Sequence, residues 1–247
     1  MTNPTLGRNL LNSSSDILES NHAMTINGTI LKTCVLGLFT ALTFAYSWTL
    51  LLSGYADKAT MLYKFGFIGG IIIAAFICFG PKNKFLIITT PLYAMCEGLI
   101  LGFISAYVNT IFPGIASQAA IGTLFALFGM FFLYKTNLVK ATEKFRMVIS
   151  NSTLAILGIY VLQLILGFFH LSIPAIFSNS PVGIGFSILV VAVASFSLII
   201  DFDNIKTFAG KLDKNFEWYF GFSLLVTIIW MYIEILNLLI KLQSRNN

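Results

Sequence analysis

The stretch VGIGFSILVVAVASFSLII, residues 182–200, decides the fold class because it runs for nineteen residues without a charged side chain. About 20 apolar residues in a helix cross the hydrocarbon core of a bilayer. The rest of the chain has the same character, since 57% of its 247 residues are hydrophobic and only 10% are charged. So few charged residues cannot cover a water-soluble surface. The sequence therefore predicts an integral membrane protein.

Seven windows are long and apolar enough to span a membrane as helices. They lack the strict alternation of apolar and polar residues that membrane β-barrels require. The connections between them are short, so we expect an all-α protein with one seven-helix transmembrane domain over residues 25–247. The windows are Ile30–Leu52, Met61–Phe79, Phe85–Val108, Ile111–Tyr134, Met147–Phe169, Val182–Ile200 and Phe220–Leu242.

The first 24 residues, MTNPTLGRNLLNSSSDILESNHAM, are rich in Asn, Ser and Thr. They lack the apolar core and the small-residue cleavage site of a signal peptide. We interpret residues 1–24 as a polar, disordered tail on the cytoplasmic side. The first apolar helix then serves as its own insertion signal.

Orientation follows from the loop charges, because Lys and Arg are retained on the cytoplasmic side. The second, fourth and sixth loops carry nine such residues, whereas the odd loops carry only Lys58. The amino terminus is therefore predicted to be cytoplasmic. Seven crossings would place Lys241 and Arg245 on the opposite face, so the last helix either crosses against this bias or enters and returns. The nine residues are Lys82, Lys84, Lys135, Lys140, Lys144, Arg146, Lys206, Lys211 and Lys214.

Acidic side chains within the predicted spans are the candidates for function. A charged residue at the centre of a membrane helix costs about 2.5–3.5 kcal/mol unless it finds a partner or water. Glu97 and Glu234 lie in the interior of their windows, and Asp201 and Asp203 follow directly on Ile200. Glu234 is too deep for its carboxylate to reach the interface easily, so we expect it to face the bundle interior.

Asp201 or Asp203 is the expected partner of Glu234, because a short loop joins the sixth and seventh helices. Two carboxyl groups that share one proton satisfy each other's hydrogen bonds and respond to pH. This pairing requires the sixth helix to continue through DFDNIKTF toward Gly210, a residue suited to ending it. The alternative stays open that Asp201 and Asp203 are interfacial residues that balance Lys206.

Several functional classes are not indicated. No metal-ligand spacing or disulfide framework involves Cys34, Cys78 or Cys96. The acids of DFD diverge by about 200° on a helix, and there is no Gly-x-Gly-Asp stretch, which argues against an intramembrane aspartyl protease. The net charge of +5 arises from loops that suit an anionic membrane leaflet, without a soluble domain to bind nucleic acid. We expect no enzyme activity and no cofactor.

Three stretches resemble the Bax inhibitor-1 family, also called transmembrane Bax inhibitor motif proteins, and in particular its bacterial branch. They are EGLILGFIS (97–105), SLIIDFDNI (197–205) and EWYFGFSLLVTIIWMYIEILNLL (217–239). The start of the first helix, MTINGTILKTCVLG (24–37), is similar as well. The resemblance implies a bundle whose last helix is central and wrapped by the other six. It also implies a multi-pass protein of the bacterial inner membrane.

The resemblance further implies a pH-sensitive leak for cations, calcium above all, that is closed by a proton-sharing pair of acids. The matching positions are Asp201 on the sixth helix and Glu234 on the seventh, with Asp203 and Glu97 as supporting acids. The same two carboxylates would be transient calcium ligands, completed by water or backbone carbonyls. The seventh-helix acid is usually Asp in the calcium-leak members. Those members also supply an arginine from the second helix, which has none here.

A rival hypothesis also follows from the resemblance. Members of the family are linked to suppression of cell death, and bacterial relatives are linked to a membrane protease and to stress responses. The chain would then be a non-conducting regulator that binds a membrane protease or another complex through its tail and basic loops. Calcium flux in reconstituted vesicles distinguishes this reading from the leak.

Overall fold

The computed structural model describes residues 23–82, 84–169 and 173–246. The chain divides into two compact units. Unit 1 holds the described residues as far as Tyr107 together with Asn204–Leu225, and unit 2 holds Val108–Asp203 together with the chain from Val226 onward. The predicted single domain over 25–247 and the central place of the last helix stay predictions.

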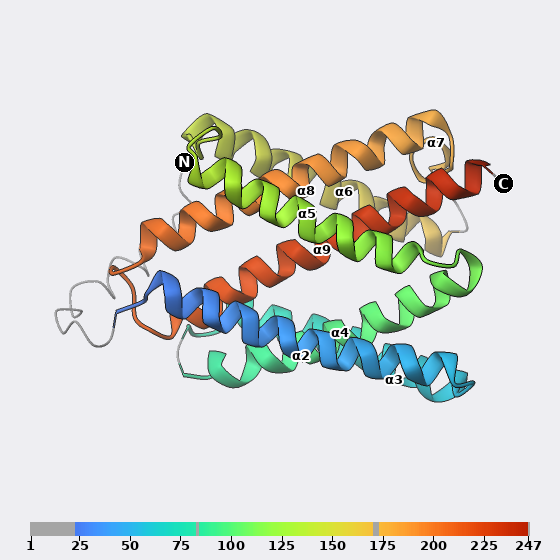
Figure 1. Ribbon diagram of the computed structural model, residues 1–247, viewed down its shortest axis with the longest axis horizontal. Coiled ribbons are helices and arrows are strands. Elements are labelled where there is room, and N and C mark those ends of the chain that lie inside the picture. The colour runs from blue at the N-terminus through green and yellow to red at the C-terminus, as the bar shows by residue number, and fades with distance from the viewer. Residues whose placement is uncertain (1–22, 83, 170–172, 247) are drawn as a thin grey trace. The chain divides into compact units, whose positions relative to one another are not determined.

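Eight helices and no strand occur in the described residues, and seven of the helices are long and apolar enough to cross a membrane (Figure 1). This confirms the predicted class, an all-α protein with seven transmembrane spans. The helices are α2 (Ile26–Leu52), α3 (Ala56–Phe79), α4 (Leu86–Ile111), α5 (Ile115–Lys135), α6 (Glu143–Phe168), α7 (Pro174–Phe177), α8 (Pro181–Phe208) and α9 (Phe216–Asn246).

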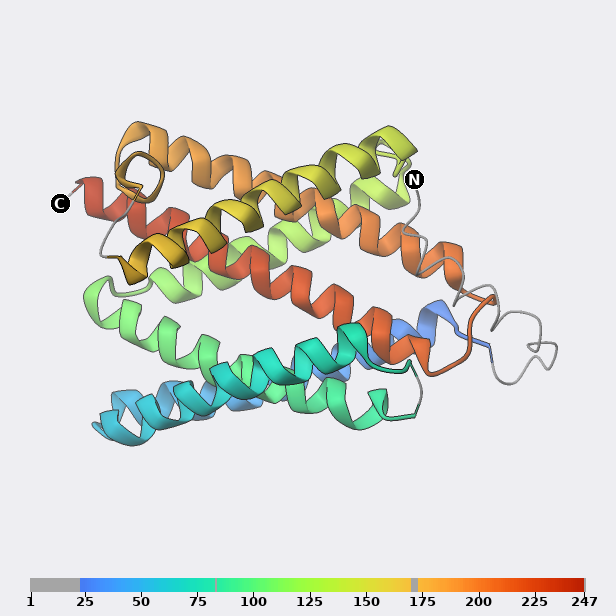
Figure 2. The ribbon, with the colours of Figure 1, turned by 180° about the vertical axis from the view of Figure 1, so that it is seen from behind.

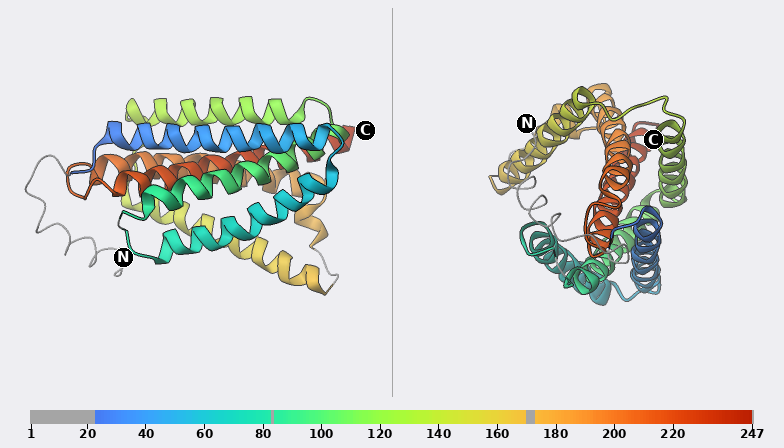
Figure 3. Two further views of the ribbon diagram at one scale, coloured as in Figure 1. Left: turned by 90° about the horizontal axis from the view of Figure 1, so that it is seen from below. Right: turned by 90° about the vertical axis from the view of Figure 1, so that its left-hand side faces the viewer.

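Several predicted helix ends were wrong by a few residues. The sixth predicted window stopped at Ile200, but α8 continues to Phe208, and Gly210 follows with a φ of +77°. The last helix starts at Phe216 rather than Phe220 and runs unbroken for 31 residues (Figure 3). A search for apolar residues misses such ends, because terminal helical turns carry polar and charged side chains. The helix α7 lies in a loop of the predicted scheme because its four residues are far too few for a membrane span.

Many large apolar side chains point away from the protein. Phe79, Phe125 and Phe168 are 92%, 76% and 78% exposed. A soluble protein rarely shows so much contiguous apolar surface. Hydrocarbon tails are the environment that suits these side chains, as expected for spanning helices.

Unit 1 is built from α2, α3 and most of α4, which lie side by side in Figure 1, together with the end of α8 and the start of α9. Thr40 and Ser47 on α2 donate hydrogen bonds across to the α4 carbonyls of Ala94 and Leu99, at 3.1 and 2.9 Å. Hydroxyl-to-carbonyl bonds of this kind hold neighbouring membrane helices together. They fix how α2 and α4 are aligned along their lengths.

Glycines let α4 approach both of its neighbours in unit 1. A Cβ at Gly102 would lie 2.9 Å from the Cα of Phe44 on α2, and one at Gly66 on α3 would lie 2.9 Å from the carbonyl oxygen of Cys96. Contacts so short exclude any side chain larger than hydrogen. Gly98 and Gly102 therefore serve close packing of α4 on α2, and Gly66 serves it on α3, as the small-residue rule for membrane helices predicts. A Cβ at Gly70 would make only ordinary contact, at 3.7 Å from the Cβ of Cys96.

The chain ahead of α2 is bound to the connection between α8 and α9. The Met24 N–H donates to the Leu212 carbonyl at 2.7 Å, and the Gly210 N–H donates to the Met24 carbonyl at 2.8 Å. The Met24 side chain is 1% exposed. Residues 1–22 of the predicted tail lie outside the described residues, but Ala23 and Met24 belong to the packed part of unit 1.

Lys82 caps the carboxyl end of α3 in unit 1. Its ammonium donates to the carbonyls of Ile77 and Cys78 and lies 4.8 Å from the centre of the Tyr219 ring. A lysine in this place satisfies carbonyls that have no partner within the helix. Burial lowers the pKa of Lys82 below its ordinary value, and the nearby Cys78 partly opposes this.

Unit 2 has an apolar core between α6 and α8, which cross one another in the rear view of Figure 2. Ile149 and Ile156 from α6 meet Val190 and Val193 from α8, and all four are at least 93% buried. Trp230 packs against this group from α9. Tyr160 of α6 also packs against this core, so the core positions both Tyr160 and Trp230.

We expect Gly102→Ala to destabilise the protein by about 1–3 kcal/mol, because the added methyl group would overlap the Phe44 backbone and force α2 and α4 apart. Thermal unfolding in detergent measures the loss. Gly37→Ala on α2 is the matched control, since a Cβ there meets nothing within 4 Å. Equal melting temperatures for the two variants would contradict the role given to Gly102.

Candidate functional site

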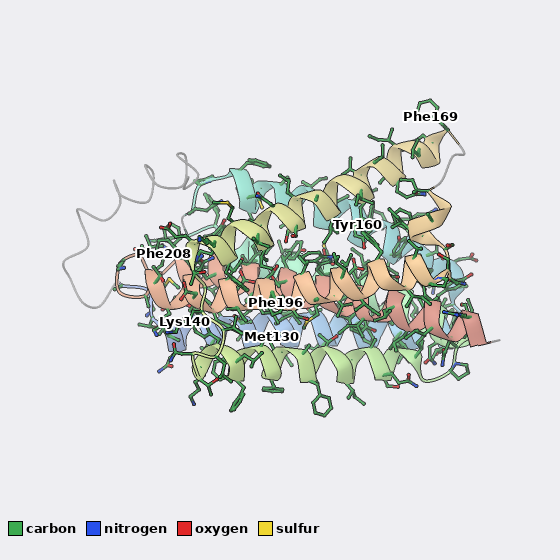
Figure 4. All side chains as sticks on the ribbon, turned by 90° about the horizontal axis from the view of Figure 1, so that it is seen from above. Met130, Lys140, Tyr160, Phe169, Phe196 and Phe208 are labelled. Carbon is green, nitrogen blue, oxygen red and sulfur yellow. The ribbon has the colours of Figure 1, made fainter. Side chains whose placement is uncertain are left out.

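Glu234 is a buried acid within the membrane-spanning part of α9, with 3% of its surface exposed. Its Oε1 accepts a hydrogen bond from the Tyr160 hydroxyl at 2.7 Å and another from the Trp230 indole N–H at 3.1 Å. Tyr160 comes from α6, where Figure 4 labels it, and Trp230 lies one turn earlier on α9. The carboxyl group thus receives neutral donors from two helices of unit 2.

Asp201 lies on the extension of α8 that the apolar window did not reveal. Its Oδ2 accepts a hydrogen bond from the Thr227 hydroxyl of α9 at 2.6 Å. Thr227 and Trp230 are three residues apart, which makes them neighbours on one face of α9, about 4.5 Å apart along its axis. Asp201 and Glu234 therefore take their donors from adjacent turns of the same helix.

Asp201 and Glu234, the two predicted gate residues, thus lie at one face of α9 within unit 2. Each accepts hydrogen bonds from different donors. The longer α8 is what allows this, as the pairing hypothesis required. Direct proton sharing between Asp201 and Glu234 stays a prediction, since their described hydrogen bonds are to Thr227, Tyr160 and Trp230.

Asp203 has a different set of partners. It forms an ion pair with Arg146 at the start of α6 and accepts a hydrogen bond from the Tyr134 hydroxyl of α5 at 3.0 Å. Both side chains of the ion pair are about 30% exposed, so solvent weakens their attraction. The sequence offered Lys206 as the basic residue that Asp203 balances and predicted Arg146 as a loop charge, so this ion pair was not expected.

Glu97, the other supporting acid, lies in unit 1. It is half-buried on α4 and bonded to the side chain of Tyr93, one turn earlier on the same helix. The Tyr93 ring in turn packs edge-on against Phe222 of α9, with centroids 4.8 Å apart. Glu97 thus belongs to a separate polar site, on the other compact unit from Asp201 and Glu234.

A fifth acid, Glu217, is the most deeply buried and was not predicted. It is 1% exposed and forms an ion pair with Lys32 on α2. Its Oε1 also accepts from the N–H and the hydroxyl of Thr25, the residue that caps α2, at 2.9 and 2.8 Å. The helix start attracts a negative charge, so the carboxylate of α9 secures the amino-terminal end of α2.

One signal in the sequence could have indicated this cluster, because Lys32 is a charged residue inside the first predicted window. The structure adds that Gly28 leaves room for the acid, since a Cβ there would overlap the Glu217 carboxylate. Glu217 itself lay just outside the last window, which is why it was not weighed among the membrane acids.

Within the described ranges, no group of three or more His, Cys, Asp or Glu side chains could hold a metal ion. The described cysteines are free thiols. Any cation held by Asp201 and Glu234 would need hydroxyls, carbonyls or water for the rest of its oxygen shell. The carboxyl groups of Asp201 and Glu234 are themselves groups that can bind a proton.

A family model described as Bax inhibitor 1 like matches residues 3–244, which is nearly the whole chain. No curated protein and no solved structure matches the chain.

We expect Lys32→Met to cost about 3 kcal/mol of stability, because it leaves the Glu217 carboxylate buried without its counter-charge. Adding Glu217→Gln should restore part of this loss, since the double variant buries no unpaired charge. Unfolding in detergent of the two single variants and the double variant gives the coupling energy. Additive losses in the double variant would refute the pairing.

Proposed function

Since the chain belongs to the Bax inhibitor 1 like family, we propose that it is a pH-sensitive cation leak of the cell membrane, gated by Asp201 and Glu234. Calcium is the proposed permeant ion. The amino terminus is proposed to be cytoplasmic and the membrane to be a bacterial inner membrane, in line with the nine basic residues of the even loops.

One observation carries the proposal: a buried carboxyl group inside a spanning helix receives its described hydrogen bonds from uncharged donors. Tyr160 and Trp230 can hold Glu234 in either protonation state, because each only donates to its oxygen. Glu217, in contrast, is paired with a lysine, and Asp203 with an arginine. Glu234 is thus suited to gain and lose a proton without breaking an ion pair.

The proposed gate works through the charge on Asp201 and Glu234, which take hydrogen-bond donors from one face of α9. At low pH a proton shared by Asp201 and Glu234 leaves one negative charge, and the two side chains hold α8 and α9 together. At higher pH the proton leaves and both carboxylates are charged, so they repel one another and attract a cation. Thr227 and Tyr160 place hydroxyl oxygens beside these carboxylates, which suits a hard, oxygen-seeking ion.

A membrane regulator that binds a protease or another complex is the competing function, and it predicts no flux. Its proposed contact regions are the tail, residues 1–24, and the basic loops. Residues 1–22 lie outside the described residues. Ion flux of the purified protein separates the two functions directly.

We expect purified protein in liposomes loaded with a calcium dye to conduct calcium faster at pH 8 than at pH 6. Asp201→Asn together with Glu234→Gln should remove this pH dependence, because neither amide can lose a proton in that range. Flux in the double variant should then differ less than about twofold between the two pH values. The dye signal over time gives the rates.

Glu143→Gln is the matched control for the double variant. It makes the same chemical change on an exposed acid in the first turn of α6. Its flux and pH response should equal those of the unchanged protein. A leak that ignores pH, or that responds to pH equally with and without the two acids, would defeat the proposed gate.

A further inference from the structure

Lys241, near the carboxyl end of α9, has its ammonium group enclosed by oxygen atoms. It donates to the carbonyl of Ile176 in α7 at 3.0 Å and to the carbonyl of Gly183 in α8 at 3.1 Å. A third bond goes to the hydroxyl of Ser187, also in α8, at 2.9 Å. All three donor-acceptor pairs lie within unit 2.

This oxygen set is the kind that binds metal cations. Carbonyl and hydroxyl oxygens replace the hydration shell of a cation in selectivity filters and in calcium sites. The Ser187 side chain is buried, with 3% exposed, so its hydroxyl is fixed toward the ammonium. The ammonium group of Lys241 thus occupies a site lined by these three oxygen atoms, and its positive charge is covalently attached to α9.

The position of Lys241 relates it to the proposed gate. Lys241 follows Glu234 by seven residues, and Glu234 follows Thr227 by seven. Seven residues are close to two helical turns, so the three side chains lie on one face of α9, about 10 Å apart along the axis. An ion at the Glu234 carboxylate therefore lies within reach of the field of the Lys241 ammonium.

We propose that Lys241 is a tethered cation that limits the leak and sets its preference among ions of different charge. This inference rests on the proposed function, because it assumes that cations pass Glu234. The ammonium repels an entering ion, and it competes with that ion for the Glu234 carboxylate. It also occupies oxygens that would otherwise coordinate the ion.

The effect depends on the valence of the ion in a defined way. The electrostatic work of bringing an ion to a given point is proportional to its charge. If the ammonium lowers the flux of a monovalent ion by a given factor, it lowers the flux of a divalent ion by the square of that factor. For an ion about 10 Å from the ammonium, in a medium of intermediate polarity, we expect the charge to lower potassium flux roughly threefold and calcium flux roughly tenfold.

The test is Lys241→Met, which keeps most of the length of the side chain and removes the charge. Calcium and potassium fluxes are measured on the same liposome preparations at pH 8. We expect calcium flux to rise about tenfold and potassium flux about threefold. Arg245→Met is the matched control, because Arg245 is an exposed basic residue in the last turn of the same helix.

A second variant separates charge from packing. Lys241→Cys is made in a background with serine at Cys34, Cys78 and Cys96, and is labelled in detergent before reconstitution. An aminoethyl label restores a positive charge on a chain of similar length, and a sulfonatoethyl label places a negative charge there. The calcium-to-potassium flux ratio should fall with the first label and rise with the second.

The outcomes distinguish the inference from the function on which it rests. A leak in the unchanged protein with the same flux ratio in Lys241→Met and after both labels would overturn the inference alone. Equal changes in both fluxes whatever the charge at position 241 would show that Lys241 only anchors α7 and α8. Absence of flux from the unchanged protein and from every Lys241 variant would overturn both proposals.

Discussion

A carboxyl group buried in a spanning helix must obtain its hydrogen-bond donors from the protein, because hydrocarbon offers none. This constraint explains the placement of the acids described above. Glu217 takes a lysine and a helix start, Asp203 takes an arginine and a tyrosine, and Glu234 takes a tyrosine and a tryptophan. The partner that each acid obtains decides what it can do. Among the described bonds, Glu217 and Asp203 have a basic partner, whereas Glu234 has only uncharged donors.

The same scarcity of donors shapes how the helices pack. Threonine and serine hydroxyls in α2, α5 and α8 bond to carbonyls of their own helix four residues earlier. Thr40 extends this pattern by donating to a neighbouring helix as well. Glycines then bring the helix backbones close enough for such short side chains to reach across. In lipid, glycine, serine and threonine thus hold helices together, whereas in water large apolar contacts do so.

The seven spans could be predicted from the sequence, because a run of about twenty apolar residues is typical of a membrane-spanning helix and of few other structures. The extension of α8 past Ile200 and the early start of α9 were harder, since charged residues in those turns end an apolar window. The acids could be identified from the sequence as charged residues within or beside apolar stretches. Their hydrogen-bond donors could not be identified, because the bonds of Tyr160 to Glu234 and of Lys32 to Glu217 join residues 74 and 185 positions apart. Such pairs are set by tertiary packing, on which one sequence carries little information.

The bond between Lys32 and Glu217 bears on how the protein is made. The lysine enters the bilayer with the first helix, whereas its counter-charge is synthesised 185 residues later. At translation rates of about 5–20 residues per second, this delay is roughly 10–40 s. During that interval the first helix carries an uncompensated positive charge, which favours holding its amino-terminal end near the lipid headgroups. The bond between Lys32 and Glu217 can therefore form only after the last helix has been synthesised, so this end of the first helix is completed late.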